Sequence, residues 1–210
     1  MDMFFLYLLG FVALFFFLHI FSAVFRESPE EKGRRGEAFV NKYAIKYLTE
    51  EYHLLNNVTL EITQGTTQID HIIISPYGVF VIETKNKSGW IYGSGRQKNW
   101  TQTFPTGDKY SFQNPLRQNY KHLKVVQDMF SLKKYQIHNL VVFVGESDFQ
   151  TPMPQNVTEG YEFISYIKSH TESVLSDKQV EDIIKKLELM RLEDTKETDR
   201  KHIENLKRLN

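Results

Sequence analysis

The sequence contains no cysteine among its 210 residues. This absence excludes a disulfide framework, a thiolate metal site and a cysteine nucleophile, and it fits a reducing compartment. The sequence also lacks net charge, because 26 basic side chains balance 26 acidic ones. Broad electrostatic attraction to polyanions is therefore excluded, and any contact with nucleic acid must use a local basic patch. The length suits one ordinary domain with appendages.

The first appendage is an apolar segment at the N-terminus. Residues 3–25 form a run of 23 residues without Asp, Glu, Lys or Arg, and about 20 apolar residues suffice to cross a bilayer. We predict one transmembrane helix over 3–25. A cleaved signal peptide is the alternative, but it needs a positively charged start, and the only charged residue before the run is Asp2. Basic residues follow the run and predict a single-pass protein of the cell membrane with its soluble domain in the cytoplasm; they are Arg26, Lys32, Arg34 and Arg35.

The remaining chain divides by composition into four parts. These are a charged linker at 26–33, a core domain at 34–145, a C-terminal extension with an amphipathic helix at 146–190, and a charged tail at 191–210. Apolar and polar periodicity predicts helices and strands in the order helix, three or more strands, helix, strand, helix. That order indicates an α/β (α+β) domain, with a mixed sheet flanked by helices.

The predicted elements follow particular patterns. Val40, Ala44 and Leu48 repeat at helical spacing within 33–52. Strands are predicted at 57–63, 69–74, 79–84 and 137–144, with a further strand or pair in 89–104. Asn114 and Pro115 are typical of a helix start, and the apolar face of that helix is predicted to contain Leu116, Tyr120, Leu123 and Phe130. The late helix is marked by Val180, Ile183, Ile184 and Leu187.

Two acidic residues and a lysine lie near the open end of a predicted hairpin, in IDHIIISPYGVFVIETKN at 69–86. If Pro76 and Tyr77 alone form the loop, Asp70 lies opposite Glu83, and opposed Cβ atoms are about 4.5–5.5 Å apart. Two carboxylates at that spacing need a cation, a proton or water between them, which suggests a divalent-metal site. Lys85 shares the face of Glu83. A bulge at Gly78 would shift the register by one residue, and a solvated edge pair is the plainer alternative.

Two helices add further candidates. Glu37 heads the buried stripe of the first helix, where a carboxylate is costly without a partner, although a role in capping the helix is the alternative. In FQNPLRQNYKHLK, residues 112–124, a basic stripe suited to phosphates is formed by Arg117, Lys121 and Lys124. A solvated helix face would show the same pattern. Gln118 could orient a water or a base, or be an ordinary surface amide.

Five blocks of the sequence, in order, resemble the nuclease-related domain family, often abbreviated NERD, of the PD-(D/E)xK nuclease superfamily. They are GEAFV, TTQIDHIIISPYGVFVIETKN, GWIYGS, WTQ and FQNPLRQNYKHL, and they fall within residues 33–145. The resemblance implies a restriction-endonuclease-like core in which Asp70 and Glu83 bind Mg²⁺ (or Mn²⁺) with the Thr84 carbonyl. It also implies that Lys85 orients or activates water, with Glu37 as a supporting acid and Gln118 in the family's glutamine block.

The function expected from this resemblance is that of a membrane-anchored, cytoplasmic, metal-dependent nuclease. It would hydrolyse phosphodiester bonds of DNA or RNA, with DNA favoured. The superfamily's proline before the first acid is replaced here by Ile69. A noncatalytic module on the same fold, binding nucleic acid or a protein at the membrane, is the alternative. A protein scaffold that uses the tail at 191–210 is a third hypothesis.

Overall fold

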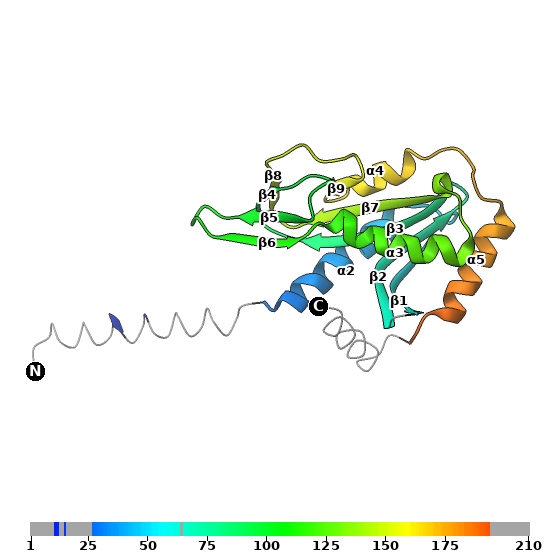
Figure 1. Ribbon diagram of the computed structural model, residues 1–210, viewed down its shortest axis with the longest axis horizontal. Coiled ribbons are helices and arrows are strands. Elements are labelled where there is room, and N and C mark those ends of the chain that lie inside the picture. The colour runs from blue at the N-terminus through cyan, green and yellow to red at the C-terminus, as the bar shows by residue number, and fades with distance from the viewer. Residues whose placement is uncertain (1–10, 13–14, 16–26, 64, 194–210) are drawn as a thin grey trace, which may run out of the picture. The chain divides into compact units, whose positions relative to one another are not determined.

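A computed structural model describes residues 11–12, 15, 27–63 and 65–193 of the chain (Figure 1). The chain divides into two units, residues 1–32 and 33–210. Within the described residues, no helix combines the length and apolar character that a membrane crossing requires. Apart from residues 11, 12 and 15, the predicted transmembrane helix at 3–25 lies outside the described residues, as does most of the charged tail.

The larger sheet is mixed, as predicted. Its strand order is β1-β2-β3-β7-β9, with antiparallel pairing from β1 to β3 and parallel pairing from β3 to β9. The strands are β1 (His53–Ile62), β2 (Gly65–Ser75), β3 (Gly78–Asn86), β7 (Ile137–Val144) and β9 (Val157–Glu159). The central strands β3 and β7 are apolar along most of their length because helices cover both faces.

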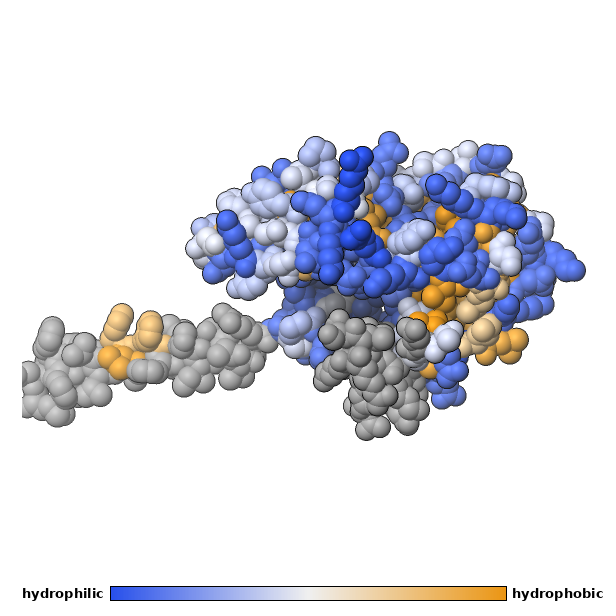
Figure 2. Space-filling model, viewed as in Figure 1, coloured by the Kyte–Doolittle hydropathy of each residue, from blue (hydrophilic) through white to orange (hydrophobic). Residues whose placement is uncertain are grey.

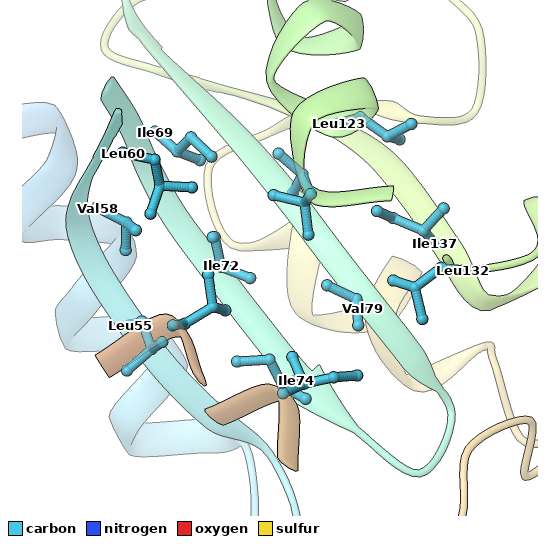
Figure 3. Close-up of a cluster of buried hydrophobic side chains, with 14 of the residues drawn as sticks. Leu55, Val58, Leu60, Ile69, Ile72, Ile74, Val79, Leu123, Leu132 and Ile137 are labelled. Carbon is cyan, nitrogen blue, oxygen red and sulfur yellow. The ribbon is translucent and has the colours of Figure 1, made fainter. Parts of the chain in front are cut away.

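Two hydrophobic clusters lie on opposite faces of this sheet. On one face, Ile72, Ile74 and Val79 pack with residues of α3 (Pro115–Phe130) and α5 (Asp177–Met190) (Figure 3). On the other, Ile73 and Phe80 pack with α2 (Pro29–Tyr47) and α4 (Glu162–Lys168). Alternation over Ile72, Ile73 and Ile74 thus supplies both clusters.

Helix α2 begins earlier than the sequence pattern indicated. Residues 29–33 were predicted as part of a linker, but they are helical. The Ser28 hydroxyl accepts a hydrogen bond from the Glu31 N–H at 3.1 Å, and the Glu31 carboxylate accepts one from the Ser28 N–H at 2.9 Å. This reciprocal capping box starts the helix at Pro29, so that Glu30 and Glu31 lie in its first turn. Val40 and Ala44 are buried as predicted.

A second, four-stranded sheet has the order β6-β5-β4-β8. Its strands are β4 (Gly89–Tyr92), β5 (Asn99–Thr103), β6 (Lys109–Gln113) and β8 (Ser147–Phe149). Trp100 and Ile91 are fully buried in its core with Phe143 of β7. The predicted strand or pair in 89–104 is therefore β4 and β5. Strands β8 and β9, from the segment predicted as a C-terminal extension, pair directly with core strands β4 and β7.

Helix α3 starts at the predicted position, and its buried face differs from the prediction. The Asn114 side chain caps the helix by accepting from the Leu116 N–H at 2.9 Å. Tyr120, predicted on the apolar face, is 56% exposed, whereas Asn119 is fully buried. The Asn119 amide donates to the carbonyl oxygens of Val81 at 2.7 Å and Leu140 at 3.1 Å. The buried amide nitrogen is satisfied by these hydrogen bonds to two strands, which a hydrophobicity pattern does not reveal.

Candidate metal centre and active site

The β2–β3 hairpin has the predicted register. Its pairs run from Ser75 and Gly78, across a loop of Pro76 and Tyr77, to His71 and Ile82. No bulge at Gly78 shifts the register. The pairing stops after the last of these pairs, so Asp70 and Glu83 are the next residues of the two strands and lie at the open end of the hairpin.

Asp70 is attached to β3 through the backbone of Thr84. The Asp70 Oδ2 accepts a hydrogen bond from the Thr84 N–H at 2.7 Å. In a strand, the N–H and C=O of one residue point toward the same neighbouring strand, so the Thr84 carbonyl shares that edge with Asp70. Asp70 is only half-buried. Its carboxylate and this carbonyl thus form an oxygen-rich corner that solvent can reach.

Glu83 and Lys85 form an ion pair that also binds α3. Glu83 is 3% exposed, and its Oε1 lies 2.5 Å from the Lys85 Nζ. The same Nζ donates to the Gln118 Oε1 at 3.0 Å. Lys85 is therefore held between a carboxylate on its own strand and an amide on the helix above. The structure brings these three predicted residues together.

Helix α2, which carries Glu37, packs on the sheet face opposite α3. Burial is the main reason that the pKa of Asp70 is raised, and the negative charge of Glu37 adds to that rise. The residue before it, Gly36, is buried where α2 approaches the strands. A Cβ at Gly36 would lie 3.0 Å from Val144 Cγ2 and 3.1 Å from Asn86 Cβ. This close approach places Glu37 within electrostatic range of the hairpin end.

Replacement of Gly36 by valine is expected to lower the free energy of unfolding by about 1–3 kcal/mol, because the added atoms have no space. A Cβ at Gly33, in the same helix, would meet nothing within 4 Å. Gly33→Ala should therefore raise stability by about 0.5–1 kcal/mol through helix propensity. Chemical denaturation of both variants measures the difference. Equal effects of the two substitutions would contradict the close approach of α2.

The charges of the cluster are unequal. Burial raises the pKa of Asp70 well above its ordinary value, and the charges of Glu83 and Glu37 raise it further. Burial also raises the pKa of Glu83, but the charge of Lys85 and the contact with His122 outweigh burial and leave that pKa lowered. Burial lowers the pKa of Lys85, but the negative charges around it, chiefly that of Glu83, together have the larger effect, and the pKa is raised. Glu83 and Lys85 are thus a charged pair, and Asp70 is the group that holds a proton or needs a cation.

The donor set fits a hard divalent cation. Among the described residues no group of three or more His, Asp or Glu side chains is arranged to hold a metal ion. The oxygen donors near the hairpin end are the carboxylates of Asp70 and Glu83 and the Thr84 carbonyl. Mg²⁺ keeps several waters and binds proteins through one or two carboxylates plus substrate phosphate. A cation beside Asp70 would also remove the electrostatic cost of its charge.

The sequence interpretation missed two residues of this cluster. His122 Nε2 lies 3.6 Å from Glu83 Oε2, and its Nδ1 lies 2.7 Å from the Thr67 hydroxyl. Thr67 on β2 therefore fixes a histidine that contacts the second oxygen of Glu83. A signal was present, because His122 follows Gln118 by four residues and shares its helix face.

The predicted basic stripe divides into two parts. Arg117 and Lys121 are exposed and line a groove beside α3. Lys124 instead donates to Asp128 Oδ1 at 3.1 Å and to Gln127 Oε1 at 2.9 Å. It does not line that groove.

A mixed sheet flanked by helices is the general kind of fold found in the PD-(D/E)xK nuclease superfamily. The chain belongs to the nuclease-related domain family, whose sequence profile matches residues 32–144. An uncharacterised protein of Bacillus anthracis is 49% identical over 107 residues, which cover 50% of this chain and 50% of that protein. No solved structure matches the chain.

Proposed function

We propose that the protein is a membrane-anchored, cytoplasmic, divalent-metal-dependent nuclease that cleaves phosphodiester bonds, with DNA favoured over RNA. The observation that carries this proposal is the convergence of Asp70, Glu83 and Lys85 at one hairpin end. Membership of a nuclease-related family supports it. The apolar run at 3–25, followed by basic residues, supports the anchor and the cytoplasmic side.

A bound Mg²⁺ or Mn²⁺, held by Asp70, Glu83 and the Thr84 carbonyl, would supply Lewis-acid stabilisation of the phosphate and a more acidic water. Lys85 is kept charged by Glu83. Its ammonium is therefore placed to orient water and to stabilise negative charge on the phosphate. The Gln118 amide fixes the direction of the Lys85 ammonium, and Glu37 adds negative charge that favours cation binding.

A noncatalytic module that binds nucleic acid or a protein is the second candidate. One observation favours it: the two Glu83 oxygens face Lys85 at 2.5 Å and His122 at 3.6 Å. The Glu83 carboxylate is thus already paired with the Lys85 ammonium and in contact with a histidine. In that case nucleic acid would bind without a metal and without being cut.

Full-length protein incubated with DNA or RNA substrates separates the two candidates. We expect cleavage with Mg²⁺ or Mn²⁺, none with a chelator, and faster cleavage of DNA. The reason is that charge at the phosphate must be neutralised, and Lys85 alone supplies only one positive charge. Gel analysis of the products measures the rates. Intact substrates under all metal conditions, with binding indifferent to metal, would favour the noncatalytic module.

A further inference from the structure

A groove of about 920 Å³ lies on the flank of α3 that faces away from the carboxylates. Its walls come from α3 and from the residues around the start of β5 and the end of β6. Three cations line it, Lys98, Arg117 and Lys121, and no carboxylate does. None of the three forms an ion pair with a described residue. The surface over this side of the molecule is largely hydrophilic (Figure 2).

Helix geometry separates this groove from the metal centre. Gln118 and His122 point toward Lys85, Glu83 and the β2 side of α3. On the opposite side of α3, Leu116 packs against the hydrophobic cluster around Trp100 and Phe143. Leu116 also lines the groove, together with Asn139 of β7. Arg117 and Lys121 stand on the outer ridge of the helix between the two sites. A chain of phosphates that leaves the metal centre can cross this ridge into the groove.

The wall opposite α3 is fixed before any ligand binds. The side chain of Asn114 is fully buried, and its amide donates to the carbonyl oxygens of Ser94 at 3.1 Å and Gln97 at 2.7 Å. Its backbone N–H donates to the Lys98 carbonyl at 3.0 Å. The residue that caps α3 therefore also holds the segment that ends in Lys98. A preorganised wall lowers the entropic cost of binding.

The other lining groups fit unpaired bases. Tyr120 is 56% exposed at the groove, and an exposed aromatic ring stacks on bases that are not already stacked in a duplex. Asn99 and Gln113 add amide donors and acceptors to the lining. The volume lies in the range of ligand pockets, about 300–1,000 Å³, which suits a few nucleotides of one strand.

We propose that this groove binds single-stranded nucleic acid, with phosphates on the three cations and a base stacked on Tyr120. The proposal rests on the proposed nuclease function and specifies it: the substrate has a single-stranded segment that extends across α3 from the cleaved bond. A protein ligand is an outcome of the test and would appear as an absence of nucleic-acid binding.

The test is fluorescence anisotropy with the full-length protein in EDTA, so that neither metal nor cleavage takes part. The probes are an oligonucleotide of about 10 nucleotides, within known single-strand site sizes, and its matched duplex. We expect tighter binding of the single strand and a loss of about 5- to 100-fold in Tyr120→Ala, the range for one stacked base. Lys98→Ala and Lys121→Ala should each reduce the slope of log affinity against log salt by about 0.7.

Two variants are matched controls. Lys124→Ala removes a cation of the same helix that is paired outside the groove, and Tyr135→Ala removes a tyrosine that is 63% exposed elsewhere. Neither should change single-strand binding more than twofold. Duplex binding as tight as single-strand binding, unchanged affinity in Tyr120→Ala, or no binding of either probe would overturn the proposal. If Tyr120→Ala lowers single-strand affinity but the wild-type protein never cleaves nucleic acid, the groove is a binding site and only the proposed nuclease activity is wrong.

Discussion

Lys85→Ala is expected to lower the rate of DNA cleavage by about 100- to 1,000-fold, the usual effect of removing one group that stabilises developing charge. Metal binding should survive, because the substitution frees the Glu83 oxygen that Lys85 contacts at 2.5 Å. The expected pattern is therefore a lost rate with a retained or stronger affinity for Mg²⁺. Single-turnover cleavage and titration calorimetry measure the two quantities separately.

A matched control for this substitution is Lys185→Ala. Lys185 also pairs with a glutamate, Glu181, at 2.6 Å, but on an exposed helix face of α5, so its loss should change neither rate nor metal affinity. A thermal unfolding curve for Lys85→Ala shows whether the variant is folded. Cleavage by folded Lys85→Ala at the wild-type rate would remove Lys85 from the mechanism.

Asp70→Asn is expected to reduce Mg²⁺ affinity by about 100-fold or more, since even indirect changes around a metal site cost about 10- to 100-fold. Stability should change in the opposite direction. The pKa of Asp70 is raised in the folded protein by burial and by Glu83. Folded protein thus loses stability as pH rises from the unfolded pKa through the folded one. The neutral amide escapes this cost while its oxygen still accepts from the Thr84 N–H.

Two measurements test the expected combination of lower Mg²⁺ affinity and higher metal-free stability. They are chemical unfolding in EDTA at neutral pH and titration with Mg²⁺. Asp128→Asn is the control, because Asp128 is exposed and pairs only with Lys124 among the contacts described. It should alter neither property. Should Asp70→Asn bind Mg²⁺ like the wild type, Asp70 would not be a ligand. Should it unfold more easily without metal, the Asp70 carboxyl would be a stabilising group instead.

Local patterns were sufficient to predict the hairpin that carries the site. A two-residue loop at Pro76 and Tyr77 predicted the register that the structure has, from Ser75 and Gly78 to His71 and Ile82. Asn114 followed by Pro115 likewise predicted the start of α3. Both signals depend on residues near one another in the sequence. Neither needs knowledge of which helix covers the sheet.

Features that depend on distant contacts were missed. Strands β8 and β9 are three residues each, too short to show alternation, and they exist because β4 and β7 offer edges to pair with. Asn119 is polar at a buried position, since two strand carbonyls need its amide. His122 shares the helix face of Gln118, but its contacts with Thr67 and Glu83 join residues far apart in the sequence. The start of α2 was missed for a different reason: its capping box was visible in Ser28 and Glu31, but the surrounding charges suggested a linker.

A crystal structure of the protein soaked in Mn²⁺ tests the central claim most directly, through the anomalous signal of the metal. The account predicts one strong peak bound by the carboxylates of Asp70 and Glu83 and by the Thr84 carbonyl, with Lys85 beside it and water in the remaining positions. Lys85 still paired with Glu83 and no peak at the hairpin end, at Mn²⁺ concentrations that support cleavage, would contradict it.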